Sequence, residues 1–558
     1  MQTTVQSRTG DPRRSMTAAG VALAVLWLAS IVLWLTPGIV VPDGAGYYVY
    51  LPSAILGGDL VFFDEWARIG AIRDGVILFK EVTATDHLGN HWPAGSALVW
   101  APGFVLGHVI SSATGGAAGG WSLPYNVATA CVSAFAGLLV MFGTWKVAMR
   151  WTTPARAAAA AAAGWLGTNL LWYSLVNSLT AHAISAALTT GLVLLSLRLR
   201  EKCDAAGWLA AGMVGGLACA VRPQNLVLVV IPFVIAWSSA GRSTLVRKLP
   251  WYALGGILGA SPQLLVSWVL YGNPLGFTYF GDSSPGTPFA SFARLWWWEP
   301  LFSWYHGLFI WTPVALVGVA GFAALWRRDR RLALSGIWVF LSFWAINATM
   351  ERSFWGGFAF GQRKFDALIP FIVIGLGALI AARPVISLAA IAPACVWTVL
   401  LMFASRSELD LNSYQTGSEL AAAAARAVVS AGEQLRFLSA VPPVAKPTVA
   451  LVAIVTLLML ALVFLGVRRL RFGVAIALLV AYLAAADVWI LWVARNDAAA
   501  IEPWRPLLES NRGSDSPGAI GMRMDLLQRE LAYLRRSGRD DEAARTEAEI
   551  RRIRPGTD

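Results

Sequence analysis

Charged residues and cysteines are both scarce in this chain. Only 14% of its 558 residues are Asp, Glu, Lys or Arg, whereas 57% are hydrophobic, which is not the composition of a soluble enzyme. The four cysteines fall in or next to apolar stretches, without the paired loop spacing of a disulfide framework or of a zinc site. We therefore interpret them as small buried apolar residues.

Apolar residues come instead in repeated blocks of about 20, the length that crosses the hydrocarbon core of a bilayer. The mean hydropathy of +0.59 agrees with a polytopic, all-α membrane protein. The net charge of +12 could indicate a nucleic-acid partner. The basic residues, however, stand at the ends of apolar blocks, as the positive-inside rule produces, so no nucleic acid is expected.

The first apolar run, residues 18–35, follows Arg8, Arg13 and Arg14. This charge layout is that of a signal peptide, but the run is too long and has no small-residue cleavage site before Pro37. We expect an uncleaved first span that begins in the cytoplasm.

Charge also decides how residues 93–112 are interpreted. They are apolar and rich in Pro and Gly, yet a crossing here would put Lys146, Arg150 and Arg156 on the outer face. We therefore expect a juxtamembrane or re-entrant helix. The remaining blocks predict about 13 spans with the C-terminus outside: 18–35, 124–145, 157–176, 181–197, 205–221, 225–240, 251–271, 305–326, 333–349, 366–382, 385–404, 448–466 and 473–493.

This topology predicts four parts in a protein of the inner, or plasma, membrane. They are a cytoplasmic arm (1–17), a transmembrane catalytic module (18–385), C-terminal transmembrane helices with an outer segment at 405–447 (386–495), and an extracytoplasmic helical tail (496–558). The tail carries apolar residues at helical spacing and is expected to be a solvated appendage.

The first outer loop, residues 38–92, is a polar segment between apolar helices and contains seven acidic and three basic residues. Near its start, Asp43 is flanked by Gly44 and Gly46 and followed by the aromatic pair Tyr47-Tyr48. A carboxylate held on a flexible turn at the membrane surface suits a general base that takes a proton from an acceptor hydroxyl. The alternative is that Asp43 only solvates a helix end. Amphipathic helices lying on the membrane account for the other acids of the loop.

Two of the five histidines, His87 and His91, are spaced as i and i+4 near the end of this loop. On a helix they would face a common metal, but Gly89 and Asn90 between them favour a turn, and the Glu of a zinc peptidase motif is missing. We expect them to bind a sugar or a phosphate by hydrogen bonds. No cofactor is certain; a hard divalent cation held by the loop acids stays open.

Three basic residues stand on the outer side, where they are disfavoured. Arg222 interrupts two apolar helices and is costly there unless it snorkels or binds an anion. In the pair Arg363-Lys364, the planar guanidinium of the arginine can donate two parallel hydrogen bonds, and the ammonium group of the lysine supplies a compact positive charge. Together they suit a phosphate group. The open alternative for this pair is a structural ion pair with Glu351 or Asp366.

Taken together, these features resemble the GT-C superfamily of integral-membrane glycosyltransferases over roughly residues 15–385. They are the short arm, one span, an acidic loop with an early Asp, the His91-Trp92-Pro93-Ala94-Gly95 segment leading into a juxtamembrane helix, and 13 spans. The superfamily includes protein O-mannosyltransferases, the lipid A aminoarabinose transferase and oligosaccharyltransferase catalytic subunits. Tyr271-Gly272-Asn273-Pro274 and the stretch from Trp355 to Arg363 look like features of its bacterial members.

The resemblance implies inverting transfer of a sugar from a polyprenyl-phosphate donor, a membrane lipid, to a glycan, lipid or protein acceptor on the outer face. It maps the family's early-loop carboxylate onto Asp43 as the catalytic base, although Gly44 replaces the Glu of the mannosyltransferase Asp-Glu motif. The residues expected to bind substrate are Tyr47, Tyr48, His87, His91, Arg222, Gln362, Arg363 and Lys364.

Two other functions stay open from the sequence. A transporter or lipid flippase would need charges near the bilayer midplane and internal repeats, whereas no repeat is found and the notable charges lie at one face. A non-catalytic scaffold could share the same fold.

Overall fold

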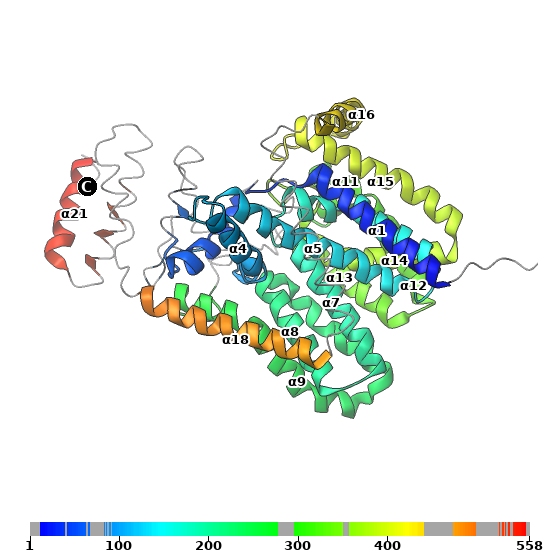
Figure 1. The fold of residues 1–558 in the computed structure, drawn as a ribbon, viewed down its shortest axis with the longest axis horizontal. Helices are drawn as coiled ribbons and strands as arrows, with labels where there is room; N and C mark the ends of the chain where they lie inside the picture. The colour runs from blue at the N-terminus through cyan, green and yellow to red at the C-terminus, as the bar shows by residue number, and fades with distance from the viewer. Residues whose placement is uncertain are drawn as a thin grey trace, which may run out of the picture.

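Every regular element in the part of the chain that the structure describes is a helix (Figure 1). The computed structural model describes residues 12–39, 42–62, 92–276, 295–349, 356–439, 472–497 and 539–553, with single positions between 65 and 90 and between 524 and 535. Nine of the helices in these ranges are long and apolar enough to cross a membrane, and three shorter ones are apolar as well. The predicted all-α membrane class is confirmed, whereas the number of 13 spans is not.

Several expected spans are not single long apolar helices in the described residues. Those at 205–221 and 225–240 correspond to the shorter helices Ala205–Val221 and Pro223–Trp237, and the one at 305–326 is divided into α11 (Leu308–Trp311) and α12 (Val314–Trp326). The expected span at 157–176 is divided into α6 (Pro154–Gly167) and a π-helix, η2 (Trp172–Val176). The expected span at 448–466 lies outside the described residues.

Residues 93–112, expected to be juxtamembrane or re-entrant, form most of α4 (Gly95–Ala113), which is itself long and apolar enough to be a span. α4 packs closely on α5 (Leu123–Ala148) through two glycines. A Cβ atom on Gly107 would lie 2.5 Å from the Tyr125 Cα atom, and one on Gly103 would lie 2.7 Å from the Ala128 carbonyl oxygen. α1 (Pro12–Trp34) crosses over α5 and α6 at the surface (Figure 1).

α9 (Ile231–Tyr271) is helical along its length but reverses direction. In a straight helix, residues 233 and 252 would be about 28 Å apart. The ring centroids of Phe233 and Tyr252 are instead 4.9 Å apart, and the Tyr252 hydroxyl donates to the Val229 carbonyl at 2.9 Å. The segments expected as spans at 225–240 and 251–271 therefore run antiparallel, but only the second, Ser243–Tyr271, is long enough to be a candidate span, and Pro223–Trp237 is a shorter apolar helix.

The second arm of α9 lies backbone to backbone against α8 (Ala205–Val221). A Cβ atom on Gly216 would come within 2.1 Å of the Gly256 oxygen, and one on Gly212 within 2.1 Å of the Tyr252 oxygen. Stripes of small residues let the backbones of two helices approach this closely. In lipid this matters because the hydrophobic effect contributes little free energy to helix association. α7 (His182–Glu201) packs beside both helices.

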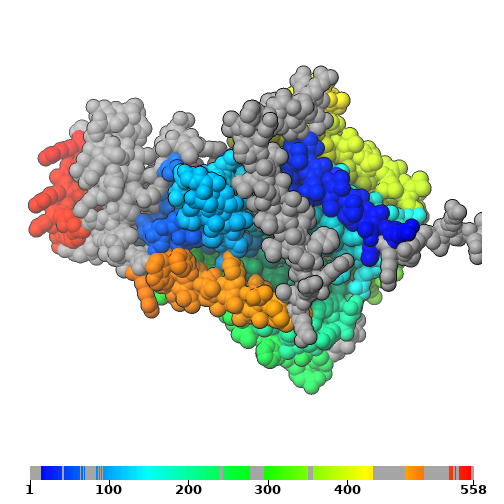
Figure 2. Space-filling model, viewed as in Figure 1, coloured from blue at the N-terminus to red at the C-terminus, as the bar shows by residue number. Residues whose placement is uncertain are grey.

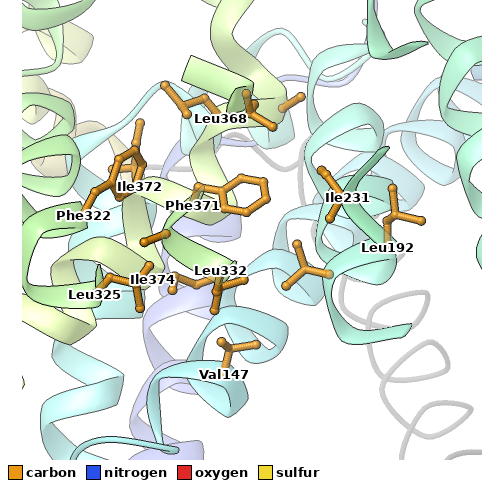
Figure 3. Close-up of a cluster of buried hydrophobic side chains, with 14 of the residues drawn as sticks. Val147, Leu192, Ile231, Phe322, Leu325, Leu332, Leu368, Phe371, Ile372 and Ile374 are labelled. Atoms are coloured by element: carbon orange, nitrogen blue, oxygen red, sulfur yellow. The ribbon is translucent and has the colours of Figure 1, made fainter. Parts of the chain in front are cut away.

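Among the candidate spans in the described residues, the one with the largest buried share contains α14 (Ile369–Ala382). Its Phe371, Ile372 and Ile374 lie among Phe322 of α12 (Val314–Trp326) and Leu332 of α13 (Arg330–Ala348) (Figure 3). Because apolar side chains surround it, α14 holds the segment that precedes it, the 3-10 helix η5 (Arg363–Leu368), firmly against its neighbours.

Ion pairs fasten the end of the bundle that the sequence predicts to be cytoplasmic. Arg200, near the end of α7, contacts both carboxylate oxygens of Asp329, which caps α13, at 2.7 and 3.0 Å. Arg198 similarly contacts both carboxylate oxygens of Asp204, the cap of α8. The Arg198 hydrogen bonds lower the pKa of Asp204 to about 2.

The C-terminal helices lie outside this bundle. α15 (Pro384–Ser407) carries α16 (Gly417–Ser439) on its outer end, and α18 (Phe472–Asp497) runs along α9 on the face seen in Figure 2. The tail contains α21 (Asp540–Ile553), which lies beyond the end of the bundle (Figure 1). The remaining short helices are α2 (Pro42–Tyr48), η1 (Pro52–Gly57), η3 (Pro223–Val230), α10 (Glu299–Phe302) and α11 (Leu308–Trp311).

Candidate functional site

Asp43 lies in the first turn of α2, a short helix that packs tightly through its glycines. A Cβ atom on Gly44 would lie 3.0 Å from the Leu179 carbonyl oxygen, and one on Gly46 would lie 1.9 Å from the Trp92 ring. The expected flexible turn is thus wrong: the glycines permit close backbone approach and hold Asp43 on a fixed helix.

The carboxylate of Asp43 forms an ion pair with the guanidinium of Arg363, between Oδ2 and Nη1. The Asp43 side chain is 28% exposed and that of Arg363 is 13% exposed. Gly356 and Gly357 precede the arginine with φ angles of +89° and +71°, values that favour glycine. A Cβ atom on Gly356 would lie 3.3 Å from the Arg363 side chain, so the turn folds directly over it.

A second group of buried polar side chains surrounds Asp366, three residues further along η5. Its Oδ2 atom lies 2.6 Å from Arg222 Nη1 and 3.0 Å from His182 Nδ1. Its Oδ1 atom accepts a hydrogen bond from the Ser185 hydroxyl at 3.2 Å. The sequence left open a pairing of Arg363-Lys364 with Asp366; Arg363 contacts Asp43, and Asp366 contacts Arg222.

Arg222 itself is 8% exposed and ends α8. The side-chain amide of Gln224 is assigned with its oxygen towards Arg222. In this orientation the oxygen accepts hydrogen bonds from Arg222 Nη2 at 2.6 Å and from Nε at 3.2 Å. The adjacent Asn225 donates to the Ser185 hydroxyl and to the Ala218 carbonyl. The guanidinium is therefore held on two sides, and its charge is fixed in place.

Tyr173 of η2 connects the two groups. Its ring centroid is 4.4 Å from that of His182, and its hydroxyl exchanges hydrogen bonds with the backbone of Phe360. The charges of Asp43, Arg222 and Arg363 all act on the Tyr173 hydroxyl. The same three charges act on Lys364, which is 7% exposed.

We call Asp43, Arg222, Arg363, Lys364 and Asp366 the charged cluster. Three cations and two carboxylates thus lie near one another in a largely apolar protein, at the ends of α2, α8 and α14. Such a cluster contains three basic side chains and two carboxylates, a composition that suits an anionic ligand such as a phosphate.

The positive charge of Arg363 also acts on the imidazole of His306. His306 is fully buried and has a φ angle of +63°, and its ring lies tilted against that of Trp311 with the centroids 4.6 Å apart. Burial lowers the pKa of His306 to about 4, and the Arg363 charge adds to this effect, although the hydrogen bond to the Leu411 carbonyl opposes it. The imidazole is neutral at pH 7.

Three other residues expected to bind substrate, Tyr47, Tyr48 and Gln362, are buried in the structure. Tyr47 is 8% exposed and packs edge-on against Trp92 and Trp100. Tyr48 is fully buried, and its hydroxyl donates to the Gly120 carbonyl at 2.7 Å, so its role in the structure is to pack α2 on the bundle. Gln362 is fully buried beside Arg363.

Of the histidine pair, His87 lies in the first outer loop, where Thr85 links it to the end of α9. Its Nδ1 atom is 3.1 Å from the Thr85 hydroxyl, which donates to the Leu270 carbonyl. His91 lies outside the described residues. In the described part of the chain, no three His, Cys, Asp or Glu side chains gather as a metal site, and the divalent cation stays a prediction.

Sequence reasoning overlooked His182 and Tyr173, and it considered Asp366 only as a partner of Arg363-Lys364. His182 and Asp366 were counted as residues of the apolar blocks 181–197 and 366–382. An ionisable side chain inside an apolar block is itself a signal, since its burial in the membrane is costly without a partner.

No family model matches the chain, and a search among curated proteins gives no match. Solved structures do show a distant likeness. ArnT from Cupriavidus metallidurans, bound to undecaprenyl phosphate, is 16% identical, with a TM-score of 0.44 over 90% of this chain and 81% of its own. Its apo state has 15% identity and a TM-score of 0.46, over 91% and 82%. An oligosaccharyltransferase from Archaeoglobus fulgidus has 12% identity and a TM-score of 0.38, over 72% and 60%.

Proposed function

We propose that the chain is a membrane glycosyltransferase that moves a sugar from a polyprenyl-phosphate donor to an acceptor on the extracytoplasmic face, with inversion at the anomeric carbon. One observation carries the proposal: the carboxylate of Asp43 contacts Arg363, and the charges of both act on the buried Lys364. A proton acceptor and two phosphate-binding groups are thus adjacent, where apolar helices end.

In the proposed reaction, Asp43 takes the proton of an acceptor hydroxyl. The oxygen attacks the anomeric carbon from the side opposite the phosphate, and the bond from that carbon to the phosphate oxygen breaks. The polyprenyl phosphate leaves with the bonding electron pair, so negative charge grows on its oxygens. One displacement of this kind inverts the configuration.

Arg363 and Lys364 stabilise the phosphate as this charge develops. Arg222 is already bonded to Asp366 and Gln224, so it contributes mainly through the field of its charge. Because Arg363 contacts Asp43, an arriving phosphate competes for the guanidinium. When the phosphate displaces Asp43 from Arg363, the carboxylate loses a neighbouring positive charge and becomes a stronger proton acceptor for the hydroxyl.

The proposal assigns the charged cluster to the transmembrane module of residues 18–385. The C-terminal helices of residues 386–495 support the bundle from outside, and the tail is an appendage. No step above depends on a metal ion.

The test uses the full-length protein in nanodiscs with an undecaprenyl-phosphate hexose and an extract of envelope acceptors. Transfer is followed as the release of undecaprenyl phosphate together with labelled product. Asp43→Asn should lower the rate about 10²–10⁴-fold. Glu408→Gln is the matched control, because Glu408 also pairs with an arginine, the exposed Arg426.

Wild-type rates in both Asp43→Asn and Arg363→Gln would refute the proposal. If labelled lipid instead changes leaflet in proteoliposomes without forming any covalent product, the chain is a flippase.

A further inference from the structure

The hydroxyl group of Tyr173 makes two hydrogen bonds to the backbone of one residue, Phe360. It donates to the Phe360 carbonyl at 3.3 Å and accepts from the Phe360 N–H at 3.0 Å. Tyr173 is 1% exposed, and Phe360 is fully buried. A hydroxyl has one hydrogen to donate, and here the backbone of Phe360 receives it. The proposed reaction gives this hydroxyl no part.

Phe360 lies in a turn, residues 356–362, that leads directly to Arg363. The turn forms neither helix nor strand, and three glycines in it have φ angles between +60° and +89°. Backbone groups in such a segment have no helix or sheet ladder to bond to, so their partners must come from other elements. For Phe360, the hydroxyl of Tyr173 serves both the N–H and the carbonyl.

Aromatic packing holds the side chain of Phe360 against the same element. Its ring stacks on that of Trp172, the neighbour of Tyr173 in η2, with the centroids 4.9 Å apart and the planes at 22°. The ring of Trp311 meets it edge-on at 5.4 Å. Both the backbone and the side chain of Phe360 therefore contact η2, so the position of the turn depends on this π-helix.

The same π-helix also contacts the chain that leads to Asp43. The Leu175 carbonyl lies in the last turn of η2, where a helix leaves carbonyls without an internal partner, and it accepts from the Thr36 N–H at 2.9 Å. Three residues beyond η2, the Leu179 carbonyl lies close to Gly44, the neighbour of Asp43, where a Cβ atom would be 3.0 Å from it. The segment around η2 thus contacts the chain on both sides of the ion pair.

The hydroxyl of Tyr173 is close enough to the ion pair for the charges of Asp43 and Arg363 to act on it. Its hydrogen, however, is donated to the Phe360 carbonyl. Donation to a phosphate oxygen would break the contact that holds the turn. The geometry therefore favours an action through Arg363 over direct contact with substrate.

We propose that Tyr173 is a positioning residue: through the backbone of Phe360, its hydroxyl keeps the guanidinium of Arg363 at the ion pair and within reach of the donor phosphate. This inference rests on the proposed transferase function and adds a residue to it. Tyr173 acts through the turn and exchanges no proton with substrate. Because Arg363 stabilises charge that grows during the reaction, a displaced guanidinium lowers kcat.

Arginine modification tests this position without relying on activity. Phenylglyoxal modifies guanidinium groups, and mass spectrometry of the full-length protein in nanodiscs gives the rate at each arginine. In Tyr173→Phe, which lacks only the hydroxyl, we expect Arg363 to react roughly 5–10-fold faster, because opening of the turn no longer breaks these hydrogen bonds. Arg426, which is 61% exposed, is the internal reference and should react equally fast in both proteins.

Tyr252→Phe is the matched control for this experiment. Tyr252 is also buried, and its hydroxyl donates to a backbone carbonyl as well, that of Val229 at 2.9 Å. Loss of this hydrogen bond should leave the modification rate of Arg363 unchanged. A wild-type rate at Arg363 in Tyr173→Phe, or an equal increase in both Phe variants, would overturn the inference.

Steady-state kinetics tests the consequence for transfer. With an undecaprenyl-phosphate hexose, Tyr173→Phe should lower kcat roughly 10-fold, the effect of one neutral hydrogen bond, with little change in KM. The same substitution added to Arg363→Gln should cause no further loss, because no guanidinium remains to be positioned. An equal loss in both backgrounds would assign the hydroxyl a purely structural role and overturn the inference.

The outcomes separate this inference from the proposed function. If the wild type transfers sugar and Tyr173→Phe does so at the same rate, only the inference fails. If the wild type transfers no sugar, the transferase proposal fails, and the part assigned to Tyr173 in it fails as well.

Discussion

Asp43 and Arg363 form an ion pair between the first outer loop and the helical turn that precedes α14. The pair joins an acid near the start of the chain to a base far along it. Because each neutralises the other, neither side chain is available to substrate until the contact is exchanged.

The first prediction is that these two residues are strongly coupled in activity. Asp43→Asn and Arg363→Gln should each lower transfer by 10²-fold or more, and the double variant should be little worse than the poorer single variant. A double-variant cycle on the transfer rate measures the coupling. Multiplicative losses would show that the two side chains act independently.

The second prediction concerns the buried pair of Arg222 and Asp366. Asp366→Asn removes the charge that balances Arg222 in a buried place, so it should destabilise the protein by about 3–5 kcal/mol. Thermal unfolding in detergent, compared with the wild type, checks this. Adding Arg222→Gln to the variant should recover part of the loss, because no uncompensated charge then remains. An equally unstable double variant would contradict this account.

The third prediction is a dependence of stability on pH that arises from His306. The pKa of His306 is lowered to about 4 in the folded protein, from an ordinary value of 6.5. The unfolded chain therefore binds more protons between these values, and the stabilisation present above pH 6.5 is lost as the pH falls towards 4. The loss from this group is on the order of 3 kcal/mol.

Asparagine is the matched replacement for His306, because it tolerates a positive φ angle and does not titrate. His306→Asn should unfold at a midpoint that changes less between pH 7 and pH 4.5 than that of the wild type. If both proteins lose the same stability over this range, another group is responsible.

The fourth prediction tests how closely α4 meets the end of α8. A Cβ atom on Gly95 would lie 2.3 Å from the Ala220 carbonyl carbon and 2.5 Å from the Val221 nitrogen. Gly95→Ala should therefore cost about 1–3 kcal/mol and displace the adjacent Arg222. In Gly119→Ala, nothing lies within 4 Å of the new atom, so its unfolding midpoint should stay near that of the wild type.

The class of fold could be predicted from sequence because it depends on composition along the chain, whereas the outer position of three cations stays a prediction. Apolar blocks identify helices, and basic residues that depart from the positive-inside pattern draw attention to Arg222 and Arg363-Lys364. Whether these side chains bind phosphate stays a prediction.

The pairing of the side chains could not be predicted in the same way. Which acid contacts Arg363 depends on how η5 lies against α2, and this is set by packing between segments far apart in sequence. His182 and Tyr173 were overlooked because an apolar window averages over the single polar residues within it. The packing function of Gly44 and Gly46 depends on Leu179 and Trp92, and a local pattern contains no sign of either.

The hydroxyl of Tyr271 joins the backbone of Asn90, and the Asn90 side chain donates to the Gly46 carbonyl, so the end of α9 anchors α2. During synthesis, the helix that carries Asp43 leaves the ribosome long before this anchor, and longer still before Arg363. A nascent chain inserted only as far as α8 therefore has the acid without either restraint. The ion pair of the site can therefore form only after residue 363 has been made, although its other member, Asp43, is among the earliest residues synthesised.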